Sequence, residues 1–223
     1  MSDDRATPAA PDEGADVATG KTIDVRFDGS RCIHARFCVL GAPDVFRANT
    51  PGNWIHPDAM GTESLVRVAE ACPSGAITYH RKDGGADEQP PPVNIVSIRE
   101  NGPYAFHAPL KIEGKTIGYR ATLCRCGDSK NKPFCDNAHV KAGFKATGEP
   151  ETRKSKPLKA RDGGLEIAPQ TDGPLEVTGN LEICSGTGRT ISRTTKTWLC
   201  RCGESQNKPF CDGTHEKIGF KSD

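Results

Sequence analysis

Hydrophobic residues in the first third of this chain predict two kinds of element, strands and a helix. Residues 21–27 and 76–80 are short segments rich in β-branched and aromatic residues, which predicts strands. Between them, residues 62–72 carry apolar side chains spaced at one helical turn, which predicts a helix. The apolar positions of that helix are Leu65, Val66, Val68 and Ala69.

Two further strands are predicted in the rest of the chain. Residues 112–123 and 189–199 are rich in threonine, isoleucine and aromatic residues, and they contain few consecutive residues that favour a helix. The segments after them contain glycine, asparagine and proline, which predict loops. Asp136 and Asp212 stand where they would cap short helices at the ends of these loops.

The same segment occurs twice in the chain. Residues 124–144 and 200–220 are identical at 15 of 21 positions. The similarity continues weakly upstream, where Gly102 and Pro103 correspond to Gly173 and Pro174. The sequence therefore contains a unit of about 45 residues that is present in two copies.

Composition divides the chain into domains and connections. Residues 81–92 and 147–164 are polar and rich in charged residues, glycine or proline, as linkers are. The first twenty residues are acidic and predict a disordered tail. The predicted divisions are a tail at 1–20, a domain at 21–80, a linker at 81–92, a domain at 93–146, a linker at 147–164 and a domain at 165–223.

The overall composition limits the possible classes of protein. Only 35% of residues are hydrophobic and 6% aromatic, so bound metal is expected to supply part of the folding free energy. A net charge of +1 gives no electrostatic reason to expect binding to nucleic acid or to a membrane surface. No apolar run is long enough to span a bilayer, and the N-terminus resembles no export signal, so we expect a cytoplasmic protein.

The chain has ten cysteines, which in a reducing compartment are more often metal ligands than disulfides. Each repeat has the spacing C-x-C-x8-C-x3-H. Two cysteines one residue apart can bind one metal atom, while the third cysteine and the histidine, one helical turn apart, can face a second. Four ligands of these types suit either tetrahedral zinc or an iron–sulfur cluster.

The repeated segment resembles the CDGSH iron–sulfur family, whose pattern is C-x-C-x2-(S/T)-x3-P-x-C-D-G-(S/T/A)-H. The second copy, CRCGESQNKPFCDGTH, fits at every position. The first copy, CRCGDSKNKPFCDNAH, has Asn137 in place of the glycine, and asparagine tolerates a positive φ. Family members build one unit from two motifs, so the resemblance implies an intrachain pseudo-dimer of two β-rich units, hence a monomer.

The resemblance also implies the ligands of two 2Fe-2S clusters. Each cluster would be held by three cysteines and one histidine, and the imidazole would raise its reduction potential relative to a fourth thiolate. The ligands implied for the two clusters are Cys124, Cys126, Cys135 and His139, and Cys200, Cys202, Cys211 and His215.

A third cluster site is predicted near the N-terminus. The segments CIHARFC at 32–38, NWIHPD at 53–58 and CPSGAI at 72–77 resemble the divergent 4Fe-4S mono-cluster family, over about residues 22–82. The resemblance implies a small ferredoxin-like domain with Cys32, Cys38 and Cys72 as ligands. Three cysteines suit a 3Fe-4S cluster. A 4Fe-4S cluster would need a fourth ligand, for which His34 is the nearest candidate, and an exposed turn histidine is the alternative.

The remaining reactive residues suggest no catalytic site. Cys184 lies outside the motifs and is expected to be a small buried residue, with a resolving thiol as the alternative. With no nucleophile–base set, phosphate loop or dinucleotide motif, we predict an α+β electron carrier that is not an enzyme. Its partners would be redox proteins or apo iron–sulfur proteins. The alternatives are an iron–sulfur cluster donor or storage protein and a non-redox zinc scaffold.

Overall fold

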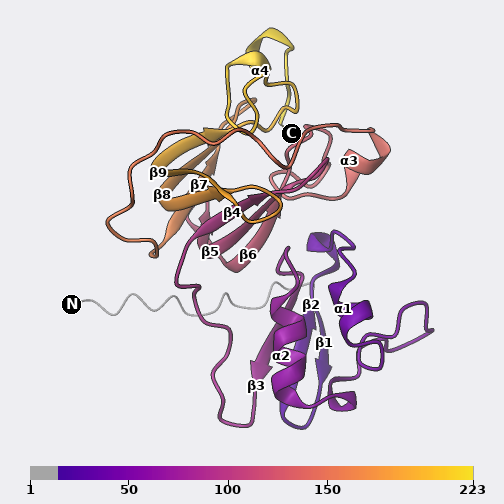
Figure 1. The fold of residues 1–223 in the computed structure, drawn as a ribbon. Helices are drawn as coiled ribbons and strands as arrows, with labels where there is room; N and C mark the ends of the chain where they lie inside the picture. Colours follow the sequence, from indigo (N-terminus) through magenta and orange to yellow (C-terminus); the bar gives the residue numbers. More distant parts are fainter. Residues whose placement is uncertain (1–14, 223) are drawn as a thin grey trace. The chain divides into compact units, whose positions relative to one another are not determined.

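The computed structural model describes residues 15–222, which form two compact units. Within the described residues, one unit ends at Gln89 and the other begins at Pro90. The division falls within residues 81–92, the segment that the sequence assigns to a linker. The chain contains both helices and strands, with strands in the majority (Figure 1).

The first unit is an antiparallel three-stranded sheet in the order β1-β2-β3, with two helices and two short 3-10 turns. Its strands are β1 (Asp16–Thr19), β2 (Ile23–Phe27) and β3 (Ile77–Arg81); its helices are α1 (Phe37–Gly41) and α2 (Thr62–Glu70); its turns are Gly29–Arg31 and Pro57–Ala59.

The helix and both strands predicted in this unit are confirmed. Leu65, Val66 and Ala69 of α2 are buried and pack in one core with Ile23 and other apolar residues of the sheet. The tail predicted at 1–20 is wrong for residues 16–19, because β1 pairs there with β2. Buried and exposed side chains do not alternate along β1, so its sequence lacks the pattern that predicts a strand. Residues 1–14 of the predicted tail lie outside the described residues.

The second unit contains both copies of the repeat in one six-stranded sheet (Figure 1). Each copy supplies a short strand, two long strands and a one-turn helix. The elements are β4 (Ile95–Ile98), β5 (Tyr104–Ile112), β6 (Lys115–Leu123) and α3 (Ala138–Lys141) in the first copy, and β7 (Leu165–Pro169), β8 (Leu175–Cys184), β9 (Thr190–Leu199) and α4 (Thr214–Lys217) in the second.

The two copies exchange strand pairings. Within each copy, the short strand pairs antiparallel with the next strand, β4 with β5 and β7 with β8. Between copies, β4 also pairs parallel with β8, and β5 pairs parallel with β7. The registers correspond, since Ile95 pairs with Glu182 just as Glu166 pairs with Lys111. Neither copy therefore completes its sheet without the other.

One apolar core lies under this shared sheet. It draws fully buried side chains from both copies, among them Phe106, Leu123, Leu181 and Leu199. Phe134 and Phe210, which precede the third cysteine of each motif, pack against it while partly buried. The cysteine loops are thus fixed to the core by the residue next to a predicted ligand.

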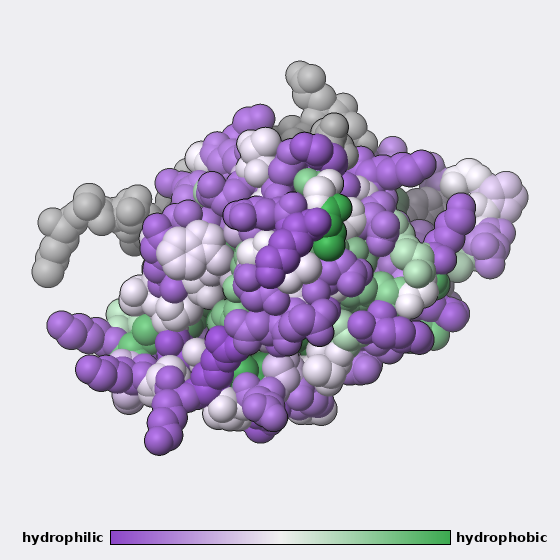
Figure 2. Space-filling view, turned by 90° about the horizontal axis from the view of Figure 1, so that it is seen from above, coloured by the Kyte–Doolittle hydropathy of each residue, from purple (hydrophilic) through white to green (hydrophobic). Residues whose placement is uncertain are grey.

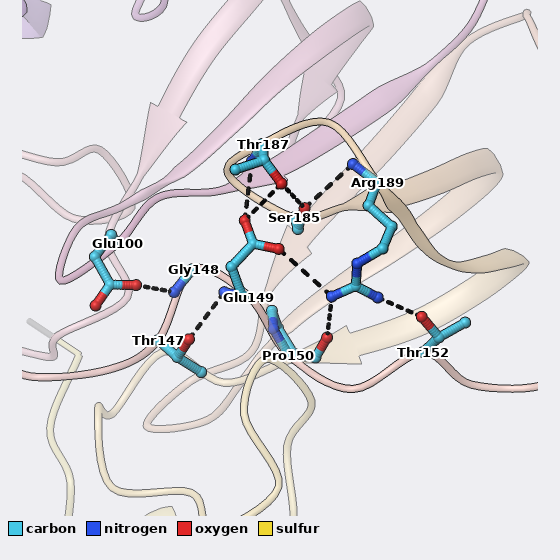
Figure 3. A network of polar contacts seen from close by, with 9 residues as sticks. All are labelled: Glu100, Thr147, Gly148, Glu149, Pro150, Thr152, Ser185, Thr187 and Arg189. Carbon is cyan, nitrogen blue, oxygen red and sulfur yellow. Dashed lines mark hydrogen bonds and ion pairs between the residues drawn. The ribbon is translucent and has the colours of Figure 1, made fainter.

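Residues 147–164, which the sequence assigns to a linker, are tied to the turn between β8 and β9 (Figure 3). The Glu149 carboxylate accepts hydrogen bonds from the backbone N and the Oγ1 of Thr187, at 3.0 and 2.9 Å. Arg189 forms an ion pair with the same carboxylate at 3.5 Å and donates to the carbonyl of Pro150 at 2.9 Å. The first residues of this connection are therefore part of the folded second unit.

Polar side chains dominate the face of the molecule that Figure 2 draws. Figure 2 shows a face covered largely by hydrophilic residues, with hydrophobic ones in small separate areas. This agrees with a mean hydropathy of −0.58. Among the described residues, no helix has both the length and the apolar character needed to cross a bilayer.

Candidate metal centres

The four predicted ligands of the first copy lie in two close pairs. Cys124 and Cys126 follow directly after β6 and place their Sγ atoms 3.8 Å apart. Cys135 Sγ lies 3.5 Å from Nδ1 of His139, which stands on α3 one turn later. The spacing of the motif therefore produces the two pairs that the sequence predicts.

The second copy reproduces this geometry after β9. The Sγ atoms of Cys200 and Cys202 lie 3.7 Å apart, and Cys211 Sγ lies 3.4 Å from Nδ1 of His215. Cys200 and Cys202 are buried, and Cys211 is partly exposed. The two sites have the same donor atoms in the same arrangement.

In each close pair of cysteines the pKa of one thiol is lowered and that of its partner is raised, so the environment favours one thiolate per pair. The pKa of Cys124 falls to about 6, because its thiolate accepts a hydrogen bond from Cys126. In the second copy the pKa of Cys202 falls to about 6, through the same contact with Cys200. Burial lowers the pKa of His139, which keeps its imidazole neutral. Thiolate and neutral imidazole are the forms that bind metal.

The serine and the lysine of each motif hold the loop in shape. Ser129 Oγ donates to the Phe134 carbonyl at 2.6 Å and accepts from Asn131 N at 3.1 Å. Ser205 makes the same two contacts in the second copy. Lys132 Nζ donates to the carbonyl of Ser129 at 2.7 Å, so its ammonium group is bound to the loop.

The aspartate of each motif connects the two ends of the loop. Asp136 accepts from Lys130 N at 2.8 Å and from Ala138 N at 3.0 Å, and Asp212 makes the same contacts in the second copy. The prediction that these aspartates are the N-cap residues is wrong by one position. Asn137 and Gly213 are the N-caps, and the Asn137 side chain makes no hydrogen bond to the helix.

The substitution at the motif glycine leaves the turn intact. Asn137 has φ +68° and Gly213 has φ +82°, so both are in the left-handed region. Asparagine enters this region at lower cost than most residues with a side chain. The sequence-based expectation that Asn137 preserves the turn is confirmed.

The two C-x-C loops lie back to back. A Cβ on Gly127 would lie 2.8 Å from the carbonyl oxygen of Cys202, and a Cβ on Gly203 would lie 2.4 Å from that of Cys126. Both glycines have positive φ, +92° and +84°. Glycine is required at both positions, because it allows the backbones of the two loops to touch.

The donor atoms do not converge on a point. Among the residues that the structure describes, no three histidine, cysteine, aspartate or glutamate side chains are close enough together to hold one metal ion. The donors lie instead as pairs, and two pairs per site fit a centre with two metal atoms. The chemistry of the donor set, thiolate with imidazole, fits iron and zinc alike.

The N-terminal unit has a pocket of about 440 Å³ that is lined by Cys32, Cys38 and Cys72. Cys38 stands on α1, Cys72 follows α2, and Cys32 follows the first 3-10 turn. The three thiols influence one another, since the charge of Cys72 contributes to raising the pKa of both Cys32 and Cys38, after the larger effect of burial. The fold therefore brings together three cysteines that are 6 and 34 residues apart in sequence.

Two further side chains line this pocket. His34 has φ +51°, and its Nδ1 lies 3.9 Å from Cys32 Sγ. Ser74 Oγ lies 3.5 Å from Cys72 Sγ and is buried, and sequence reasoning missed it. Its place two residues after a predicted ligand, in CPSGAI, was the available signal.

The remaining cysteine lies away from these sites. Cys184 ends β8 and is 6% exposed, which confirms the expectation of a small buried residue. Burial raises the pKa of its thiol.

Comparison with known families agrees with both sites. The family described as "Iron-binding zinc finger CDGSH type" matches residues 101–140 and 172–216. The family described as "Divergent 4Fe-4S mono-cluster" matches residues 18–82. The matched ranges contain every predicted ligand.

Individual proteins also match parts of the chain. "Uncharacterized protein YjdI" of Escherichia coli (strain K12) is 38% identical over 71 residues, which are 32% of this chain and 92% of that protein. "CDGSH iron-sulfur domain-containing protein 1" of Mus musculus is 29% identical over 85 residues, 37% of this chain and 76% of that protein. Its Rattus norvegicus counterpart is 30% identical over 81 residues, 35% of this chain and 72% of that protein.

Proposed function

This chain belongs to the CDGSH iron–sulfur family and carries an N-terminal domain of the divergent 4Fe-4S mono-cluster family, and from this premise we propose that it is an electron-transfer protein with three clusters. Two 2Fe-2S clusters would be held by the two motifs, and one 3Fe-4S or 4Fe-4S cluster by the N-terminal unit. When bound, such clusters accept and release single electrons. With all ligand positions filled, none offers an open site for a substrate, so we propose no catalytic activity.

The arrangement of donor atoms in pairs carries this proposal. A structural zinc ion needs four donors around one point, at about 2.0–2.3 Å from the metal. In both motifs the donors instead form one pair of thiols and one pair of thiol and imidazole. Each pair suits one iron of a binuclear cluster, which favours this assignment over the zinc scaffold.

The assignment of the third cluster rests on the N-terminal pocket. Three thiols that line one pocket suit a 3Fe-4S cluster, and His34, which lines the same pocket, would supply a fourth ligand for 4Fe-4S. Replacing His34 with alanine separates these two options. A 3Fe EPR signal that is unchanged in His34→Ala excludes the histidine as a ligand.

We further propose that the two motifs form an intrachain pseudo-dimer in a monomeric protein. The exchanged strand pairings and the contacts of Gly127 and Gly203 support this arrangement. All ten cysteines are free thiols, which suits a reducing compartment such as the cytoplasm. The partners would be redox proteins or apo iron–sulfur proteins.

The decisive measurement is made on protein purified without oxygen. Iron and sulfide are counted, and EPR spectra are recorded before and after dithionite reduction. We expect about seven or eight irons per chain and reversible 2Fe-2S signals together with a 3Fe or 4Fe signal. A colourless protein that contains zinc would overturn the proposal.

A cluster donor is the second candidate, and the histidine ligands favour it. His139 and His215 stand on four-residue helices that have no buried residue, so each is held mainly by its local turn. Transfer to an apo-ferredoxin, followed by its circular dichroism, tests this role. Transfer faster than electron exchange would favour the donor, and repeated reduction and oxidation without loss of iron would favour the carrier.

A further inference from the structure

Tyr104 reaches from the first repeat into the loop of the second site. It begins β5, and its side chain is completely buried. Its hydroxyl donates to the carbonyl of Cys200 at 2.7 Å and lies 2.9 Å from the carbonyl of Pro209. Cys200 is a predicted ligand of the second cluster, so a residue of one repeat contacts the ligand loop of the other.

The equivalent position of the second repeat carries no hydroxyl that could make this contact with the first site. The residue that corresponds to Tyr104 is Leu175, which also follows a Gly-Pro pair and also begins a long strand. Both residues are fully buried and both pair with the last residue of their own third strand, Leu123 and Leu199. The positions are therefore equivalent in structure, and Tyr104 differs from Leu175 by its aromatic ring and its hydroxyl.

Tyr104 also contacts the loop of its own repeat. The guanidinium of Arg125, the residue between Cys124 and Cys126, lies 5.9 Å from the centre of the Tyr104 ring. Arg125 is buried and donates to the carbonyls of Arg99 and Thr147, both at 2.7 Å. The tyrosine therefore contacts both ligand loops.

A hydroxyl that donates to the peptide of a ligand points its positive end toward the ligand's backbone. Hydrogen bonds and nearby dipoles are among the factors that set the potential of an iron–sulfur cluster. A donor there stabilises the more negative, reduced state. It also fixes the loop whose opening would release the metal.

We propose that Tyr104 is a positioning residue that the first repeat supplies to the second cluster site, and that it makes the two 2Fe-2S clusters inequivalent. The second cluster is reduced first and is lost more slowly. This inference rests on the proposed 2Fe-2S assignment.

The test compares Tyr104→Phe with the parent in a His139→Cys background. The additional thiolate lowers the potential of the first cluster, so that the two reduction steps separate. We expect Tyr104→Phe to reduce the reduced-to-oxidised ratio of the second cluster by roughly threefold to tenfold at fixed potential, where tenfold is about 59 mV for one electron. The first step stays unchanged. The control is Tyr79→Phe, which removes a hydroxyl that donates to Glu70 in the N-terminal unit.

Cluster loss gives a second readout that needs no reduction. On addition of a chelator, Tyr104→Phe shortens the lifetime of the second cluster alone. Tyr104→Leu places the residue of the second repeat at this position, and we expect the two lifetimes to converge. Equal effects on both clusters, or no effect on either, would overturn the inference. Clusters that are present but never reduce would contradict the carrier function while leaving the lifetimes to decide the role of Tyr104.

Discussion

At the scale of single residues, glycine is present at the two sites for two different reasons. At Gly127 and Gly203, the backbone of the other loop lies where a Cβ would be, so no side chain fits. At Gly213 a Cβ would meet open space, and only the positive φ of the turn favours glycine. Positions with a similar positive φ should therefore tolerate substitution differently, Gly213 better than Gly127 and Gly203.

We expect Gly203→Ala to destabilise the protein by about 2–4 kcal/mol, because its Cβ would meet a carbonyl oxygen at 2.4 Å and backbone atoms yield little. Gly213→Asn copies the first repeat and should cost less than about 1 kcal/mol. Denaturant unfolding and iron content measure both variants. Equal effects of the two substitutions would contradict the assigned causes.

Sequence reasoning at this scale succeeded where the signal was local. The spacing of cysteine and histidine predicted which donors would pair, and the chemistry of asparagine predicted the turn at residue 137. It missed Tyr104, whose hydrogen-bond partner Cys200 is 96 residues away. The sequence around a tyrosine in a predicted strand does not indicate which loop its hydroxyl will contact.

At the scale of elements, composition located four of the nine strands in the described part of the chain, β2, β3, β6 and β9, and the helical period located α2. Threonine, isoleucine and aromatic residues marked β6 and β9. The exchange of partners between repeats was not predictable, because β4 and β7 have two neighbours each and side-chain period does not specify which. Only the contacts of the complete sheet decide between them.

A buried carboxylate on β8 makes this sheet sensitive to acid. Glu182 is 2% exposed and accepts from Arg161 Nε at 2.6 Å, with Arg193 Nε at 3.4 Å. Burial alone would raise its pKa, but the hydrogen bond from Arg161 and the charge of Arg193 lower it below 4.5. Its contribution to stability is thus present above pH 4.5 and is lost as the pH falls through the lowered pKa.

We expect Glu182→Gln to lower the free energy of unfolding at pH 7 by about 1–2 kcal/mol, less than a fully buried pair because both arginines are partly exposed. The difference from the parent should disappear as the pH falls through the lowered pKa of Glu182. Urea unfolding followed by far-UV circular dichroism measures it. Glu176→Gln, which affects an exposed ion pair with Lys196, is the control and should change stability less. If the free energies of unfolding of Glu182→Gln and the parent differed by the same amount at all pH values, the titration of Glu182 would not be the cause.

The network around Glu149 gives a prediction for the connection between repeats. Glu149→Ala removes the acceptor for Thr187 and Arg189 (Figure 3). We expect faster amide hydrogen exchange at residues 147–153 and at the β8–β9 turn, with both clusters retained. Glu151→Ala, at a neighbouring exposed position, is the control. Unchanged exchange would mean that the network does not hold the connection.

At the scale of the whole molecule, the two compact units predict independent loss of clusters. Cys72→Ser should remove the 3Fe or 4Fe signal, because its thiol lies on the wall of the N-terminal pocket. Both 2Fe-2S signals should remain at full intensity, since their ligands lie beyond Pro90 in the other unit. EPR spin counting with iron analysis measures this. Parallel loss of the 2Fe-2S signals would show that the units depend on each other for folding.

The exchanged strands have a consequence for the synthesis of this protein on the ribosome. Strand β4 cannot pair with β8 until residues 175–184 have been translated. The cysteines of the first site therefore leave the ribosome before the sheet that supports them is complete. Residues 15–89 contain their own core and can fold while translation continues. Assembly machinery would therefore meet the N-terminal site first, and then both remaining sites together, after the last strand has left the exit tunnel.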